Sequence, residues 1–303
     1  MDVRITKPNG TTFTLSQYGV KPTDFIVESI QIDPIYEKVE GRSGTIDYGA
    51  TFGGRRIIRV PFFIEAEDTR DFSIKRDKVF ELLLDLNPFY IEEMREISGR
   101  DQLVSGKRYL VRLANTFSLN QVWKVGLGEI EFETTDLPFA ESARTTDWLD
   151  RNNIPSDWHG MGVTPGQSVS YRFPVIGEGG SGWFFLAPGF MAQSGGTGHF
   201  SIMNYGNVPI NPFEHYLKIT IDNIVGSTEF LEILNLTNGT RFRINEGVSK
   251  RVVIDGPMVT IGGLQAFRKT SRTFIELDVG RNEFKLRGAD SAFISFDFRF
   301  YYK

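Results

Sequence analysis

Apolar residues recur at every second position in many short segments of the chain, clearest in residues 58–64, 130–134, 217–221 and 294–302. A period of two is typical of a β-strand with one buried and one solvated face. In the last segment, aromatic and aliphatic residues occupy one face from Ile294 to Tyr302, while Ser295, Asp297 and Arg299 occupy the other. We therefore expect a mainly β protein.

One segment has the period of a helix instead. Apolar residues recur at helical spacing at Phe72, Val79, Leu82, Leu83 and Leu86. Asp71 is a suitable N-cap, and the pair Asn87-Pro88 ends the pattern. The sequence predicts an amphipathic helix from about Asp71 to Leu86 that packs on the strand before it.

Near the amino terminus, the dipeptide Asn9-Gly10 separates two short apolar segments. This dipeptide is typical of a two-residue hairpin turn with positive φ at both central positions. We expect a β-hairpin here.

The order of elements from Tyr36 to Met94 is distinctive: a glycine-punctuated loop, an alternating strand and the amphipathic helix. This order resembles the amino-terminal domain of the distal tail protein (Dit) family of long-tailed (siphovirus) bacteriophages, which forms the hub between tail tube and baseplate. The exit sequence Pro138-Phe139-Ala140-Glu141-Ser142 and, more loosely, residues 200–212, 235–244 and 279–286 extend the resemblance over nearly the whole chain.

The resemblance implies two β-sandwich-like domains, the first with one amphipathic α-helix and the second galectin-like. We expect a ring-forming tail domain at 1–143, a linker at 144–166 and the galectin-like domain at 167–303. It further implies a homo-hexameric ring hub. The implied partners are the tail tube protein, the tail-associated (tail tip) protein and receptor-binding or baseplate proteins, and genome DNA passes through the lumen without specific binding.

The glycine-rich segment 41–54 is the candidate for contact between subunits. Glycine permits close backbone approach at Gly44, Tyr48 and Phe52 offer aromatic anchors, and Arg55 and Arg56 offer charge. A long hairpin that stays within its own domain is an equal alternative.

Three tryptophans lie in irregular stretches: Trp148 and Trp158 in the predicted linker, and Trp183 in a glycine-rich segment. Tryptophan is enriched at interface hot spots, so Trp158 and Trp183 are candidates for contact with a partner or a glycan. The alternative for Trp148 and Trp158 is that they fix the linker onto one domain.

Composition limits the remaining function classes. The 303 residues are 40% hydrophobic, contain no cysteine and carry a formal net charge of -4, with the acidic excess in the first half. The small charge argues against a basic nucleic-acid binder, and no apolar stretch is long enough for membrane insertion. The acidic excess is either an ordinary solvated surface or the lining of a ring that repels DNA phosphate. Asp2, Arg4 and Lys7 interrupt any signal peptide, so we expect assembly in the bacterial cytoplasm and a place in the virion, at the tail tip or baseplate.

Catalytic chemistry lacks its usual residues. The three histidines, His159, His199 and His215, have no paired ligand spacing, and no nucleophile motif is present. We expect no enzyme activity, no cofactor and no metal. Two other functions stay open: a carbohydrate-binding adhesion module that recognises host cell-wall glycans, and a wall hydrolase. The tight galectin sugar motif is missing after His199, which argues against binding by the galectin route.

Overall fold

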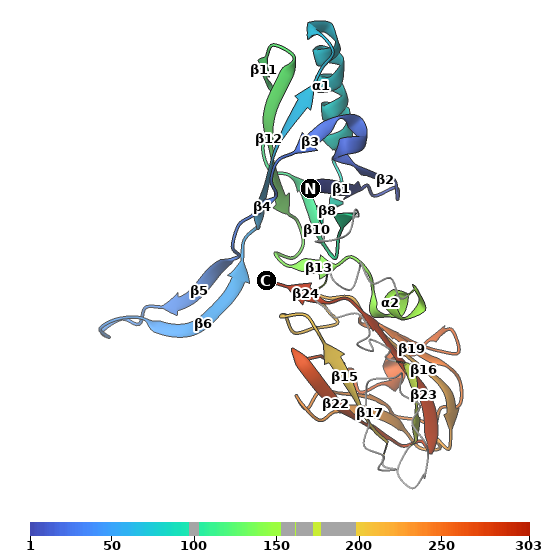
Figure 1. The fold of residues 1–303 in the computed structure, drawn as a ribbon. Coiled ribbons are helices and arrows are strands. Elements are labelled where there is room, and N and C mark those ends of the chain that lie inside the picture. Colours follow the sequence, from blue (N-terminus) through green and yellow to red (C-terminus); the bar gives the residue numbers. More distant parts are fainter. Residues whose placement is uncertain (97–102, 153–160, 162–171, 177–197) are drawn as a thin grey trace. The chain divides into compact units, whose positions relative to one another are not determined.

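The computed structural model describes residues 1–96, 103–152, 161, 172–176 and 198–303. The chain divides into two compact units, Met1–Glu141 with Lys303 and Ser142–Tyr302. Strands dominate both units, which confirms the prediction of a mainly β fold (Figure 1).

Unit 1 is built on one antiparallel sheet with the strand order β2-β1-β8-β10-β12-β7-β3. These strands are β1 (Asp2–Thr6), β2 (Thr12–Thr14), β3 (Val20–Pro22), β7 (Ile57–Glu65), β8 (Phe89–Glu96), β10 (Lys107–Leu113) and β12 (Val125–Thr134). Shorter strands extend it: β4 (Ile26–Val27) on β7, β9 (Leu103–Val104) on β8, β11 (Asn120–Val122) on β12 and β13 (Ala140–Ser142) on β10. A short 3-10 helix, η1 (Leu15–Tyr18), connects β2 to β3.

The centre of this sheet is the long pair of β7 and β12, which are in register from Val125↔Glu65 to Glu133↔Ile57. Every second residue of β7 from Ile58 to Ile64 is buried, as the alternation predicts. Ile130 and Phe132 of β12 are also fully buried. The period-two pattern therefore identified the inner face of both strands correctly.

The predicted helix is present as α1 (Thr69–Leu83), but it begins and ends earlier than expected. Its N-cap is Asp68, whose Oδ1 accepts hydrogen bonds from the backbone N–H groups of Arg70 and Asp71. The assignment of Asp71 as cap was wrong, because two aspartates lie close together and the earlier one takes the cap position. Leu86 lies beyond the helix and is 98% exposed, so it is not part of the buried stripe.

The buried face of α1 carries Phe72, Val79 and Leu83. A Cβ added at Gly126 of β12 would come within 2.5 Å of the Phe72 ring and 2.9 Å of Ile64 of β7. Because only a glycine permits this approach, Gly126 lets α1 lie close against β7 and β12. The prediction that the helix packs on the preceding strand is confirmed.

The amino-terminal hairpin exists, but its turn is longer than the predicted two residues. β1 and β2 pair from Arg4↔Thr14 to Thr6↔Thr12, which leaves residues 7–11 as the loop. Gly10 has a φ of 85°, whereas Asn9 keeps a negative φ and uses its side chain to accept from the Thr11 N–H. The dipeptide is thus part of a wider turn in which only the glycine is left-handed.

Unit 2 is a β-sandwich. A six-stranded sheet has the order β14-β23-β16-β19-β20-β21, and a four-stranded sheet has the order β15-β22-β17-β18. Phe296 of β23 lies 5.3 Å from Phe284 of β22, between ring centroids, and 6.2 Å from Phe200 of β15, so the sheets pack face to face through aromatic residues. The strands are β14 (Arg172–Ile176), β15 (His199–Asn204), β16 (Leu217–Val225), β17 (Leu231–Asn235), β18 (Arg241–Ile244), β19 (Val252–Asp255), β20 (Met258–Ile261), β21 (Leu264–Gln265), β22 (Gly280–Arg287), β23 (Ser291–Phe298) and β24 (Tyr301–Tyr302), with a 3-10 helix, η2 (Phe267–Lys269).

The range 144–166 predicted as linker contains a helix, α2 (Thr146–Asn152), which belongs to unit 2 and contacts β23. Residues 153–160 and 162–166 of that range lie outside the described residues. A stretch that looks irregular in sequence thus includes an ordered element of the second unit.

Candidate assembly interface

The candidate contact segment forms a separate β-hairpin. β5 (Gln31–Glu37) and β6 (Ile46–Gly53) pair with each other from Gln31↔Gly53 to Glu37↔Ile46, with a register shift between Pro34 and Tyr36. In the part of the chain that the structure describes, this sheet has only these two strands, drawn as a long ribbon in Figure 1. An isolated two-stranded hairpin is marginally stable in water, so it needs a surface to pack on.

One face of the hairpin is mostly apolar. Strand residues directly opposite each other lie on the same face. Ile32 pairs with Phe52, and Pro34 pairs with Ala50. The register shift places two residues of β6, Tyr48 and Gly49, opposite one residue of β5. Tyr36 therefore continues the face of Ile32 and Pro34, whereas Tyr48 lies on the opposite face.

This apolar face is solvent-exposed in the single chain. Ile32 is 62% exposed, Tyr36 59% and Phe52 44%. The opposite face has more polar contacts, because Asp33 accepts a hydrogen bond of 2.6 Å from the Gln31 side chain and its carboxylate fills the space beside Gly53. The face of Ile32, Tyr36 and Phe52 is therefore the one that would gain most from burial.

Three of the predicted interface residues lie on the hairpin. Gly44 is in the connecting loop with a φ of 84°, a conformation that glycine adopts without strain. Tyr48 lies on the opposite face from Phe52 and donates a hydrogen bond of 2.7 Å from its hydroxyl to Glu37 Oε2, which raises the pKa of Tyr48. Phe52 lies on the apolar face, and its ring meets Phe139 edge-on at 5.7 Å.

The other two predicted residues lie at the base of the hairpin and contact their own unit. Arg55 Nη1 is 2.5 Å from Glu133 Oε1. Arg56 Nε donates a hydrogen bond of 2.7 Å to the backbone carbonyl of Glu28, and its backbone N–H donates to Thr134 Oγ1. These contacts position the base of the hairpin on β12.

Sequence reasoning missed Ile32, Pro34 and Tyr36, which complete the apolar face. These three residues alternate regularly along β5. In β6 the alternation is broken by the extra residue at Tyr48-Gly49, so Tyr48 and Phe52 lie on opposite faces. A bulge of this kind inverts the alternation and hides the pattern from a period-two search.

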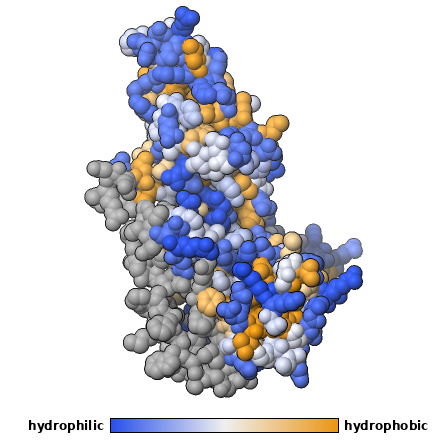
Figure 2. Space-filling view, turned by 90° about the vertical axis from the view of Figure 1, so that its right-hand side faces the viewer, coloured by the Kyte–Doolittle hydropathy of each residue, from blue (hydrophilic) through white to orange (hydrophobic). Residues whose placement is uncertain are grey.

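A second exposed apolar group lies at the far end of unit 1 from the hairpin, around α1 and the β11–β12 turn. In Figure 2 the hydrophobic atoms there are scattered among hydrophilic ones. Trp123 is 75% exposed, has a φ of 56° that is rare for a large side chain, and has Lys124 Nζ 5.1 Å from its ring. Val122 and Leu127 are also exposed.

Trp158 and Trp183, the candidates in the irregular stretches, lie outside the described residues, as does His159. His215 is buried, and its Nδ1 accepts a hydrogen bond of 3.1 Å from the Asn211 N–H, which is a structural role. Among the described residues there is no group of three or more potential ligands that could hold a metal ion, and no helix there is long and apolar enough to cross a membrane.

Comparison with known proteins agrees with this architecture. Residues 9–134 match the family model of the phage tail protein RIFT-related domain. The crystal structure of SPP1 Dit (gp 19.1), described as a paradigm of the hub adsorption apparatus in Gram-positive infecting phages, aligns with a TM-score of 0.60 at 11% identity and covers 99% of this chain and 98% of that chain. The phage P2 baseplate in its activated conformation with Ca aligns with a TM-score of 0.39 at 12% identity over 99% of this chain and 97% of that chain. No curated protein matches the sequence.

Proposed function

We propose that this chain, a phage tail protein of the distal tail (Dit) type with a RIFT-related tail domain over residues 9–134 and the fold of SPP1 Dit, forms a homo-hexameric ring hub. Its role in the tail is structural. In the proposal the ring joins the tail tube to the baseplate or tail tip, and it docks the tail tip protein and the receptor-binding proteins.

The observation that carries the proposal is the uncovered apolar face of the β5–β6 hairpin. Completing the burial of Ile32, Tyr36 and Phe52, which are 62%, 59% and 44% exposed, would stabilise each interface by roughly 2.5–5 kcal/mol, at about 1.5–3 kcal/mol per fully buried side chain. A hairpin that lies on the next subunit makes a heterologous contact, and such contacts close into a ring when the rotation between subunits permits.

In the proposal, genome DNA passes through the lumen of the ring without specific binding. The outward face of β12 carries Glu129, Glu131 and Glu133, but Glu133 is paired with Arg55 and Glu131 accepts a hydrogen bond of 3.1 Å from Asn115. The acidic row is therefore partly neutralised within the subunit. A cryo-EM map of the assembled tail with a neutral or basic lumen would contradict the idea that acidic residues of the lumen repel DNA phosphate.

Removal of the hairpin tests the proposal. Replacing Gln31–Gly53 by two glycines keeps the chain continuous, because these two residues are paired neighbours at the base. We expect wild-type protein to have six times the 34.4 kDa chain mass by native mass spectrometry, and the deletion variant to be a monomer with an unchanged core.

The matched control is Val225→Thr, which changes another exposed strand residue, 56% exposed, in unit 2. It should leave the hexamer intact. A deletion variant that still forms hexamers would move the interface away from the hairpin, and a wild-type protein that never exceeds one chain mass, alone or with tail partners, would contradict the ring.

A further inference from the structure

The outward face of the six-stranded sheet in unit 2 is polar and regular. Leu217, Ile219 and Ile221 of β16 are buried, so the alternate residues of that strand point outward. In β23 the outward residues are Phe293, Ser295 and Asp297. The pairing places Asp297 beside Lys218, Ser295 beside Thr220, and Phe293 beside Asp222, so the face consists of cross-strand rows.

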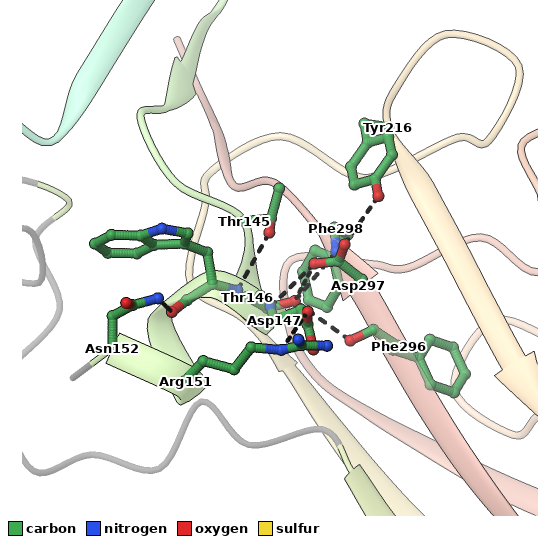
Figure 3. Close-up of polar contacts among 10 residues, drawn as sticks. Thr145, Thr146, Asp147, Arg151, Asn152, Tyr216, Phe296, Asp297 and Phe298 are labelled. Atoms are coloured by element: carbon green, nitrogen blue, oxygen red, sulfur yellow. Dashed lines mark hydrogen bonds and ion pairs between the residues drawn. The ribbon is translucent and has the colours of Figure 1, made fainter.

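Helix α2 is held against this face by hydrogen bonds to β23 (Figure 3). Thr146 Oγ1 accepts from the Phe298 N–H at 3.1 Å and lies 3.3 Å from the Phe296 carbonyl, to which it donates. The Asp147 N–H donates to Asp297 Oδ1 at 3.0 Å. Because backbone groups of both β23 and α2 take part in these hydrogen bonds, α2 is held in place beside the sheet and forms one wall of a groove.

Asp297 is also held from the other side. Tyr216 donates its hydroxyl to Asp297 Oδ2 at 2.8 Å. Burial, followed by this hydrogen bond, raises the pKa of Tyr216, so the phenol stays protonated and remains a donor. Asp297 is thus fixed at the junction of wall and floor.

Between wall and floor lies a groove of about 410 Å³. Asp147 and Arg151 line it from α2, the outward residues of β16 and β23 form its floor, and Arg251 lines the side toward β19. A volume of this size is within the range of small-molecule sites, roughly 300–1,000 Å³.

The charges of the groove are balanced. Its described lining contains three carboxylates and three cationic side chains. Arg151 pairs with Asp147 at 2.9 Å and Arg251 with Asp222 at 3.7 Å. Lys218 lies in register between Asp297 and Asp255. An anionic polymer would have to displace a carboxylate from Arg151 and from Arg251, so the groove favours an uncharged ligand.

The remaining lining suits a hydroxylated ligand. Thr220 and Ser295 supply hydroxyl groups that both donate and accept, and the paired ions supply further donors and acceptors. Phe293 is the aromatic residue of the floor and is 36% exposed. Its ring offers an apolar surface to the C–H face of a sugar ring, while the polar groups around it meet the hydroxyls.

We propose that this groove binds an uncharged saccharide, with Phe293 as the stacking platform and the Thr220–Ser295 row, Asp222 and Arg251 as hydroxyl partners. The proposal goes beyond the assembly role, since it gives unit 2 a ligand of its own. It also differs from binding through Trp158 or Trp183, because Phe293 supplies the stacking surface.

The test uses the full-length protein on an array of neutral oligosaccharides of glucose, galactose and N-acetylhexosamines, together with phosphorylated and carboxylated counterparts. We expect binding to neutral members. Calorimetry with the strongest neutral ligand should show Phe293→Ala weakening binding by at least about tenfold, which corresponds to roughly 1.4 kcal/mol.

Two further variants separate the site from general damage. Thr220→Val keeps the side-chain shape but removes a hydroxyl, and it should also weaken binding. Phe213→Ala removes an aromatic residue that is 64% exposed in unit 2 but does not line the groove, and it should bind as the wild type does.

Binding to anionic members only, binding to no member, or equal loss in Phe293→Ala and Phe213→Ala would each overturn the proposal. The number of chains per particle, measured by native mass spectrometry, should be the same for Phe293→Ala and for the wild type if the substitution affects only the groove. Failure of saccharide binding is therefore distinguishable from failure of ring assembly.

Discussion

Leu83→Asp tests whether α1 covers the β7–β12 sheet. Leu83 is fully buried near the end of the helix, whereas Leu86 is 98% exposed three residues later. The two positions form a matched pair, since the same substitution is made on the same residue type in the same segment. Only Leu83→Asp places a carboxylate inside the core.

The magnitude follows from burial. Removing the side chain, as in Leu83→Ala, should cost roughly 2–5 kcal/mol, and a buried unpaired carboxylate adds several kcal/mol more. Because a domain is stable by only about 5–15 kcal/mol, Leu83→Asp should prevent folding of unit 1. Leu86→Asp should change stability by less than about 0.5 kcal/mol.

Soluble expression and differential scanning calorimetry measure these differences. We expect Leu83→Ala to lower the Tm of unit 1 by roughly 4–20 °C, at about 2–4 °C per kcal/mol. We expect Leu83→Asp to be insoluble and Leu86→Asp to melt like the wild type. A soluble Leu83→Asp protein with a wild-type Tm would refute the packing of this helix face.

Three other outcomes are expected. Ile32→Thr combined with Tyr36→Thr leaves a β-branched residue at both strand positions but removes apolar surface from the hairpin face, so native mass spectrometry should show loss of the hexamer while calorimetry shows little change in Tm. A hydrogen bond from the Glu67 N–H lowers the pKa of Asp71. The ionised Asp71 carboxylate therefore stabilises the folded protein above its ordinary pKa of 3.8, and this stabilisation is lost as the pH falls through the folded pKa. Asp71→Asn should make the fall in Tm between about pH 5 and pH 3 smaller than in the wild type. Thr146→Val leaves the Phe298 N–H without its acceptor and should raise amide exchange in α2, with no effect on oligomeric mass.

Much of the fold could be predicted because burial imposes a period on the sequence. β7, β12 and β23 each have one face toward the core, so Val60, Ile130 and Phe296 alternate with less buried residues. In the last segment the alternation continues to Phe300 although the strand ends at Phe298, and it stops at Tyr301, which is buried together with Tyr302. Alternation therefore predicts which residues are buried over most of this segment but does not predict where the strand ends.

The errors arise where a local detail decides between two similar residues. Asp68 and Asp71 both suit a helix start, and only the backbone shows which one accepts the hydrogen bonds. Leu86 continues the helical spacing, but the backbone becomes extended at Leu84 and carries Leu86 into solvent. Sequence periodicity cannot register the end of a helix when the next apolar residue happens to keep the phase.

The candidate interface was predictable only in part. Tyr48 and Phe52 stand out as aromatic residues in a glycine-rich segment, but only the register of β5 and β6 shows that Phe52 shares a face with Ile32 and that Tyr48 lies on the opposite face. Arg55 and Arg56 looked available for a partner, yet both contact their own unit. The galectin likeness, the domain boundaries and the roles of Trp158 and Trp183 stay predictions.

The most direct test of the hub is the mass and symmetry of the wild-type protein, measured by light scattering coupled to negative-stain imaging. The account predicts six times the 34.4 kDa chain mass and ring-shaped particles with six-fold symmetry. A monodisperse monomer at all concentrations, which remains monomeric when the tail tube and tail tip proteins are added, would contradict it.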